Sequence, residues 1–247
     1  MTLSSHPLTG LLVASRRDNS PLATVEDTAL PTTLADAYKV QAQTVEALGG
    51  VGAWKVVPKP ADDAPSCSPL PAAALLEDGA NIERTDALRV EVEIAVVIGT
   101  DLTEERVYEA KDIAAAVSGL HLIFEFIGSR FADPAAMPVL ATTADLQNNI
   151  AVVVGPAHQS GELPQLDKQD IVLFDNGVEV QSTAGNASTD AMFEAIAWLA
   201  NHARLRGLPL TAGTVVITGA RLGPIAVTGP AVEARAGGFG SVTARIG

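Results

Sequence analysis

The chain has 247 residues, of which 47% are hydrophobic and 18% charged, so it can bury a substantial core as one large domain or as a lead segment plus one domain. Its formal net charge of −13 argues against nonspecific binding to nucleic acid or to an acidic membrane surface, because phosphate contacts need a basic protein surface. A single cysteine, Cys67, excludes an intrachain disulfide and a multi-thiolate metal site. No signal peptide and no apolar run of the roughly 20 residues that span a bilayer is recognised. We therefore expect a cytoplasmic, globular protein with a small-molecule site.

The first 71 residues predict a short helix with a loop, a second helix, a strand and another loop. Residues 1–30 predict the short helix and its loop. Thr32 or Thr33 can cap the second helix, which Gly49-Gly50 ends. Its predicted apolar stripe comprises Leu34, Tyr38, Gln41, Val45 and Leu48. Residues 51–57 predict a strand, and the five prolines in residues 58–71 predict a loop.

A predicted strand from Arg89 to Gly99 carries the most informative pattern, because β-branched residues fill it and the glycine ends it. Glu91 and Glu93 are two residues apart, so their side chains share a face with Cα atoms roughly 6.5–7 Å apart. Both carboxylates can therefore converge on one cation. The alternative is an amphipathic strand that shows two glutamates to water. The apolar run from Ile94 to Ile98 favours a strand buried on both faces, where carboxylates need a partner.

A second acidic position lies in the strand predicted for residues 119–128. One face of this strand comprises Leu120, Leu122, Phe124 and Phe126, and the other comprises His121, Ile123, Glu125 and Ile127. Glu125 is therefore an acid in the middle of an apolar strand, which indicates a buried carboxylate site. For His121 we favour a hydrogen-bonded core or edge histidine over a ligand role.

The remaining segments alternate too irregularly for a barrel of parallel strands. The predicted elements are a helix at 103–117 with Glu104 and Glu105 at its N-terminal dipole, an irregular or short-helical stretch at 129–149, a strand at 150–154, a hairpin at 171–181 that turns at Asn176-Gly177, a helix at 188–205, and strands at 214–218, 232–236 and 241–246. No Rossmann glycine pattern, P-loop or nucleophile elbow is present.

The order of these pieces resembles the fumarylacetoacetate hydrolase superfamily, and within it the branch of 2-keto-4-pentenoate hydratases and oxalocrotonate decarboxylases. The motifs that carry the resemblance are Arg89-Val-Glu-Val-Glu-Ile, Phe124-Glu-Phe-Ile-Gly-Ser-Arg130, Thr143-Ala-Asp145, Val216-Ile-Thr-Gly-Ala220 and Gly237-Gly-Phe-Gly-Ser-Val242. The resemblance extends from Asp36 through nearly all of the remaining chain.

The resemblance implies an α+β fold, a mixed β-sandwich roll with flanking helices, which holds one Mg²⁺ or Mn²⁺ ion on Glu91, Glu93 and Glu125. Three hard oxygen ligands suit these ions better than zinc. The ion would chelate a small anionic 2-oxo or 2-hydroxy dienoic acid, polarise its carbonyl and stabilise a dienolate. We expect a lead segment at residues 1–70 and the metal-binding domain at 71–247. A homo-oligomer, or a complex with a partner lyase, is also expected.

Further residues are carried over by motif. Lys55 aligns with a lysine placed for proton transfer, and burial lowers the pKa of a lysine toward neutrality; the alternative is a surface lysine. Asp145 is a second catalytic candidate. Arg89, Arg130 and Thr218 are the candidate substrate-binding residues.

The chain departs from the family pattern around the pocket. Val57 stands where a glycine is usual, Leu146 replaces an asparagine, Gly128 replaces an acid, and Pro69-Leu-Pro-Ala72 replaces Pro-x-x-Gly. Three readings follow. The first, which the C-terminal glycine-rich motif favours, is a hydratase that adds water to a 2-hydroxy-2,4-dienoate. The second is a decarboxylase of 2-oxo-3-hexenedioate, and the third is a non-catalytic partner in a hydratase–decarboxylase assembly.

Overall fold

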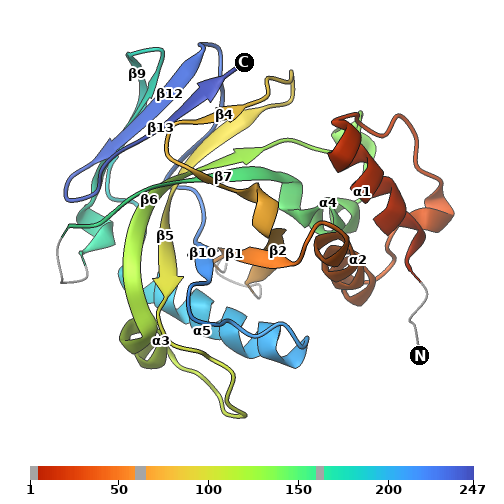
Figure 1. Cartoon of the computed structure of the whole chain (residues 1–247), viewed down its shortest axis with the longest axis horizontal. Coiled ribbons are helices and arrows are strands. Elements are labelled where there is room, and N and C mark those ends of the chain that lie inside the picture. The colour runs from red at the N-terminus through yellow and green to blue at the C-terminus, as the bar shows by residue number, and fades with distance from the viewer. Residues whose placement is uncertain (1–4, 59–64, 160–163) are drawn as a thin grey trace.

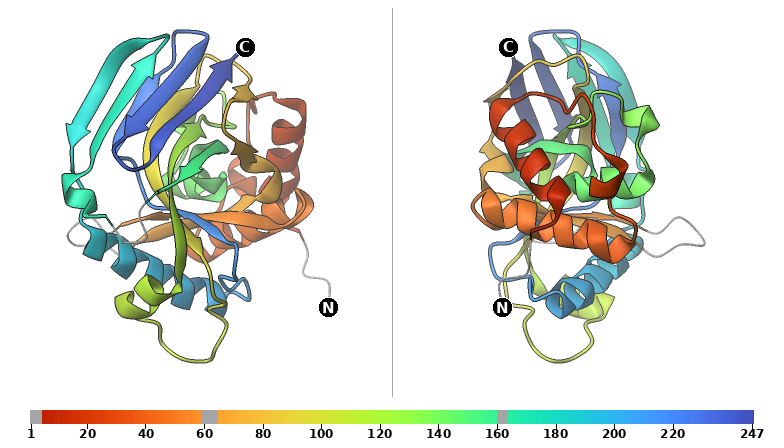
Figure 2. Two further views of the ribbon diagram at one scale, coloured as in Figure 1. Left: turned by 60° about the vertical axis from the view of Figure 1, so that its left-hand side comes forward. Right: turned by 90° about the vertical axis from the view of Figure 1, so that its right-hand side faces the viewer.

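The structure, a computed structural model, describes residues 5–58, 65–159 and 164–247 (Figure 1). Two β-sheets pack face to face, and helices cover the ends and one side of the larger sheet (Figure 2). This is the α+β architecture that the sequence predicts. No helix in the described ranges is long and apolar enough to cross a membrane.

Capping residues set the starts of two helices, and the first of these caps was predicted from the sequence. Thr33 caps α2 and shares a capping box with Asp36, and Ser188 caps α5. The helices are α1 (Pro7–Asp18), α2 (Leu34–Ala47), α3 (Ala110–Ala116), α4 (Val139–Ala144) and α5 (Thr189–Leu205), with 3₁₀ turns at Asp27–Ala29, Ala72–Ala74, Pro134–Ala136, Leu146–Asn148 and Leu166–Lys168. The predicted stripe of α2 is correct for Gln41 and Val45, but Leu34 is exposed.

The larger sheet has eight strands within the described ranges. Its order is β2 (Ser66–Pro71), β1 (Val51–Val57), β10 (Val215–Ile217), β5 (Arg89–Ile98), β6 (Val117–Ile127), β7 (Asn149–Ala157) and β3 (Leu75–Glu77), and β11 (Leu222–Ala226) also pairs with β5. β5 and β6 form its long antiparallel centre. Because β1 and β2 pair inside this sheet, the lead segment shares a sheet with the later strands, and the boundary at residue 70 stays a prediction.

The smaller sheet has the order β4 (Ala80–Ile82), β13 (Gly240–Ile246), β12 (Ala231–Ala236), β8 (Asp170–Asp175) and β9 (Val178–Ala184). β8 and β9 form the predicted hairpin, and Asn176 and Gly177 take φ angles of 48° and 79° at its turn. β7 and β13 approach closely because Gly155 leaves room for Val242.

The two faces of the larger sheet pack into different cores. Leu122, Phe124 and Phe126 contribute to the core that also contains Val242 of the smaller sheet. Ile123 belongs to a second apolar cluster on the opposite face, together with Val45 of α2, Ala53, Ala95 and Val152. Glu125 lies two residues after Ile123 on β6, so its side chain is on the same face of the sheet, toward β1 and α2.

Three predicted segments differ from the structure. The expected helix at 103–117 is limited to α3, since its capping box begins at Glu109 with Asp112; Glu104 and Glu105 therefore precede it. The predicted loop at 58–71 contains β2 from Ser66, and residues 59–64 lie outside the described ranges. β7 extends beyond the predicted strand at 150–154, and β11 is not predicted at all.

Candidate active site

Three carboxylates converge on the face of the larger sheet that points toward β1. Glu91 and Glu93 lie on β5, and Glu125 stands directly opposite Glu91 on β6. A ligand oxygen from each lies within 4.8 Å of the others. Glu93 and Glu125 are fully buried, and the side chain of Glu91 is 12% exposed. The predicted set of metal ligands is therefore brought together by strand register.

Lys55 on β1 reaches into this acidic group. Its Nζ lies 2.5 Å from an oxygen of Glu125 and 3.8 Å from an oxygen of Glu91. Burial by itself lowers the pKa of Lys55, but the charges of Glu125, Glu93 and Glu91 outweigh burial and raise the pKa above its ordinary value. The charges of the three carboxylates thus oppose the lowering that burial was expected to cause, and the sequence alone does not show that these carboxylates face the ammonium.

The carboxyl groups of Glu91 and Glu93 hold protons more tightly than usual. Burial raises the pKa of Glu91 to about 7 and that of Glu93 to about 8; the charge of Glu125 adds to this effect and the charge of Lys55 opposes it. One oxygen of Glu93 accepts a hydrogen bond from the backbone N–H of Gly219 at 2.7 Å, while its buried Oε1 has no hydrogen-bond partner. A buried carboxylate oxygen without a partner, beside two others, fits a divalent cation that takes oxygen ligands.

Asn149 supports the site and is not evident from the sequence. Its side-chain amide donates to Oε1 of Glu125 at 2.9 Å. The residues before it, Leu146, Gln147 and Asn148, all have positive φ angles, of 52°, 54° and 63°. Three consecutive left-handed residues without glycine are strained, and strain of this kind concentrates at functional sites. Leu146 is buried in the apolar cluster on the face of the three carboxylates.

Asp145 is not one of the converging carboxylates and pairs with two arginines instead. Its buried side chain pairs with Arg16 of α1 at 2.8 Å and with Arg130 at 3.3 Å. Arg16 also donates to the carbonyl oxygen of Asn149 at 2.9 Å. Burial lowers the pKa of Arg130 to about 10; Asp145 opposes this effect and Arg16 adds to it. Asp145 is thus linked to Glu125 through Arg16 and Asn149, and its catalytic role stays a prediction.

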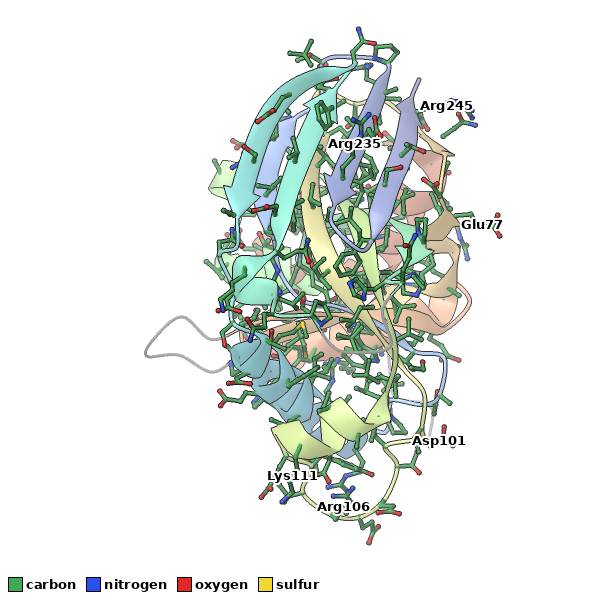
Figure 3. All side chains as sticks on the ribbon, turned by 90° about the vertical axis from the view of Figure 1, so that its left-hand side faces the viewer. Glu77, Asp101, Arg106, Lys111, Arg235 and Arg245 are labelled. Atoms are coloured by element: carbon green, nitrogen blue, oxygen red, sulfur yellow. The ribbon has the colours of Figure 1, made fainter. Side chains whose placement is uncertain are left out.

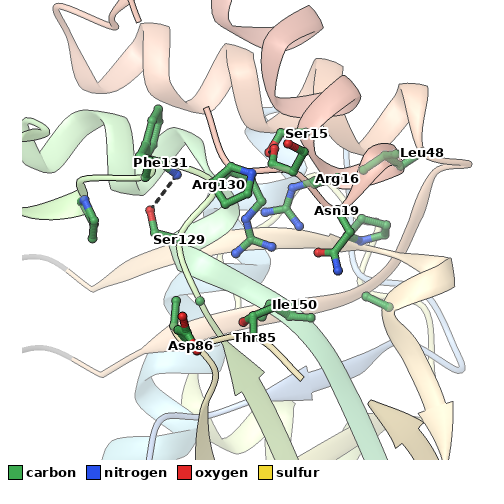
Figure 4. Close-up of a pocket in the computed structure, with 18 of the residues that line it drawn as sticks. Ser15, Arg16, Asn19, Leu48, Thr85, Asp86, Ser129, Arg130, Phe131 and Ile150 are labelled. Carbon is green, nitrogen blue, oxygen red and sulfur yellow. Dashed lines mark hydrogen bonds between the residues drawn. The ribbon is translucent and has the colours of Figure 1, made fainter. Parts of the chain in front are cut away.

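A cavity of about 570 Å³ opens beside this cluster (Figure 4). Arg16 and Arg130 point into it from one side, and Ile150 lines it from β7. None of the three converging carboxylates lines it. A Cβ atom at Gly128 would lie 2.9 Å from the terminal methyl carbon of Ile150, so a larger side chain at this position would require Ile150 to shift.

The other predicted substrate-binding residues already have hydrogen-bond partners. Arg89 is half-buried and donates to the carbonyl oxygens of Asp86 and Leu88. The hydroxyl of buried Thr218 donates to the carbonyl oxygen of Ile94 at 2.7 Å. Their contact with substrate stays a prediction. A buried cation near Thr218, Arg221, was not identified as a site residue from the sequence.

Neither His121 nor Cys67 belongs to the group of converging carboxylates. Nδ1 of His121 is hydrogen-bonded to the carbonyl oxygen of Gly155 at 2.8 Å, as the edge-histidine interpretation predicts. Cys67 is buried in β2, and burial raises the pKa of its thiol to about 11. A thiol held neutral in this way is a poor nucleophile.

A profile of the family described as fumarylacetoacetate (FAA) hydrolase C-terminal matches residues 35–247. The chain belongs to this family. The predicted resemblance, from which the three glutamates were carried over as metal ligands, is therefore confirmed. Helix α1 precedes the matched residues.

Curated relatives of this FAA hydrolase family chain include enzymes named for two reactions. It is 32% identical over 173 residues to the TodF product hydratase of Pseudomonas putida strain F1, covering 68% of this chain and 63% of the relative. It is 32% identical over 157 residues to a 2-keto-4-pentenoate hydratase of Paraburkholderia xenovorans strain LB400, covering 62% and 57%. It is 30% identical over 159 residues to a 4-oxalocrotonate decarboxylase of Pseudomonas putida, covering 64% and 60%. The matched part spans less than two thirds of each of these relatives.

A solved structure extends the similarity to the whole chain. The 4-oxalocrotonate decarboxylase from Pseudomonas putida G7, complexed with calcium and acetate, matches with a TM-score of 0.81 at 25% identity and covers 99% of both chains. The N-terminal segment outside the family match therefore also has a structural counterpart.

We expect the protein to bind one Mn²⁺ ion, and we expect Glu91→Gln, Glu93→Gln and Glu125→Gln each to weaken binding by at least about 10-fold, the loss that even outer-shell changes cause. Affinity should rise from pH 6 to pH 8, because the raised pKa values of Glu91 and Glu93 leave protons that the ion must displace. Calorimetric titration measures both effects. Exposed Glu179→Gln is the control, and equal affinity in all five proteins would refute the site.

Asp145→Asn should lower the free energy of unfolding by roughly 3–5 kcal/mol, because Arg16 and Arg130 lose their shared buried counter-ion. Urea denaturation followed by circular dichroism measures the change. Asp86→Asn, at an exposed position on the rim of the cavity, is the matched control. A loss no larger than that of the control would show that Asp145 does not hold the cluster together.

Proposed function

We propose that the protein is a divalent-metal-dependent lyase that adds water to a small 2-hydroxy-2,4-dienoate. The observation that carries the proposal is the buried group of Glu91, Glu93 and Glu125 with Lys55 at its centre. The hydratase names of two curated relatives support this reaction class. Mg²⁺ and Mn²⁺ are the proposed ions, since both take carboxylate oxygens.

When bound, the divalent ion would polarise the carbonyl group of a chelated 2-oxo acid and stabilise the negative charge of its dienolate. The chain's own residues supply the rest. Lys55 is protonated at neutral pH, and a divalent ion on the three carboxylates would offset the charges that raise its pKa, so that Nζ could then donate a proton to the substrate. Asn149 fixes one oxygen of Glu125, and Gly219 fixes one oxygen of Glu93, so that the carboxylates keep their orientation.

Decarboxylation of 2-oxo-3-hexenedioate is the second candidate, and the whole-chain similarity to a 4-oxalocrotonate decarboxylase structure favours it. The same chelated oxo group would accept the electron pair left by CO₂. The non-catalytic reading also stays open, since Leu146 fills space on the face of the carboxylates. A homo-oligomer, or a complex with a partner lyase, and a cytoplasmic location are part of the proposal.

The two reactions differ in one observable. With Mg²⁺ or Mn²⁺ and a panel of four- to seven-carbon dienoates and oxo-enedioates, water addition should remove the conjugated ultraviolet absorbance without gas. Decarboxylation should release CO₂ and produce a new dienol absorbance. Neither change, together with stable co-purification with an active relative, would favour the non-catalytic reading. Leu146→Asn combined with Val57→Gly would then be the attempt to restore activity.

Lys55→Met should lower turnover by about 100-fold or more, as expected when a general acid is lost. Binding of Mn²⁺ should be no weaker, because the substitution removes a cation that competes for Glu125 and Glu91. Steady-state kinetics and metal titration on the same sample separate the two effects. Exposed Lys111→Met, labelled in Figure 3, is the matched control. Unchanged turnover would exclude Lys55 from the chemistry.

A further inference from the structure

Arg221 lies beside the converging carboxylates on the opposite edge of β5 from Glu125. β6 flanks one edge of β5, and β11 flanks the other. Leu222, the first residue of β11, pairs with Val92 and packs in the core between the sheets. The residue before it, Arg221, donates its backbone N–H to the carbonyl oxygen of Val92. Burial lowers the pKa of Arg221, and the negative charge of Glu93 opposes this lowering.

The guanidinium of Arg221 is buried without an ion pair. The residue is only 6% exposed, and its Nε has no hydrogen-bond partner. The side-chain hydrogen bond that it makes, from Nη2 to the hydroxyl of Thr218, is long at 3.4 Å. Within the described ranges no carboxylate oxygen lies within 4.0 Å of this guanidinium, whereas Arg16 and Arg130 share Asp145. A buried charge without a partner is costly, so its retention indicates a ligand.

The charges of the site indicate what that ligand is. Three carboxylates against Lys55 and Arg221 leave one excess negative charge. A divalent cation on the carboxylates turns this into one excess positive charge. A monocarboxylate then neutralises the site, and a planar guanidinium fork matches the two oxygens of a carboxylate.

We propose that Arg221 binds the carboxylate of the 2-oxo acid that chelates the metal, an inference that rests on the proposed function. The acid then lies across β5 with its carboxylate toward β11. Its 2-oxo group and carbon chain point toward Glu125 and Lys55, where Nζ can donate a proton. Acids with a free 1-carboxylate are therefore the substrates, and the corresponding amides are excluded.

The test uses 2-oxopentanoate, which can chelate a metal but has no conjugated double bond to hydrate, and its uncharged analogue 2-oxopentanamide. Calorimetry in saturating Mg²⁺ gives both affinities for wild type, Arg221→Leu, Arg221→Lys and the control Arg235→Leu. Arg235 is an exposed arginine of the smaller sheet, so its substitution removes the same charge far from the site (Figure 3). Affinity for Mn²⁺ is measured on each protein as well.

Arg221→Leu should bind 2-oxopentanoate about 10- to 100-fold more weakly, as expected for a lost charged hydrogen bond, and should bind the amide as wild type does. The affinity of Arg221→Lys for 2-oxopentanoate should lie between the affinities of wild type and Arg221→Leu, and Arg235→Leu should bind this acid as wild type does. Mn²⁺ should bind Arg221→Leu equally or more tightly, because a repelling cation is removed. If Arg221→Leu does not fold, the loss of affinity in Arg221→Lys decides.

Unchanged affinity for the acid in the Arg221 variants would overturn the inference. Equal weakening for acid and amide, or weakened Mn²⁺ binding, would likewise reduce Arg221 to a structural role. Failure of the proposed function looks different, since wild type itself would then bind neither Mn²⁺ nor 2-oxopentanoate.

Discussion

The mutual repulsion of three carboxylates, two of them fully buried, is the constraint on which the rest of the structure depends. Two unit charges 4.8 Å apart repel by about 3 kcal/mol at an effective dielectric constant of about 20. The register of β5 and β6 nevertheless sets Glu91 opposite Glu125. The raised pKa values of Glu91 and Glu93 favour proton uptake, which relieves the repulsion together with the ammonium of Lys55. A divalent cation would relieve it more completely, so the fold itself favours binding.

A second layer of contacts keeps the carboxylates in position. Gly219 and Asn149 each hold one oxygen, and Asn149 is in turn held through its carbonyl oxygen by Arg16. The left-handed turn before Asn149 costs conformational energy, which the surrounding ion pairs and the buried Leu146 offset. Rigid placement of this kind preserves the distances that a metal site requires.

The sequence predicts the parts of the fold that local chemistry determines. The spacing of Glu91 and Glu93, the alternation around Glu125 and the turn at Asn176 depend on a few neighbouring residues, and the structure confirms them. The strand from Ser66 was missed because its prolines suggest a loop, yet they lie in a buried strand paired with β1. Three features depend on how distant segments of the chain pack together. They are the raised pKa of Lys55, the ion pair between Arg16 and Asp145, and the burial of Arg221 without an ion pair in the described ranges. Single-sequence patterns carry no signal for such contacts.

The ion pair between Arg16 and Asp145 has a consequence for protein engineering. Arg16 lies on α1, outside the family match that begins at residue 35, yet its guanidinium pairs with Asp145 and donates to the carbonyl oxygen of Asn149, which orients Glu125. A chimera that contains residues 35–247 alone would carry the three glutamates but would lack Arg16 and its contacts with Asp145 and Asn149. A domain exchange with this chain therefore has to treat the N-terminal helix and the group of three carboxylates as one transferable unit.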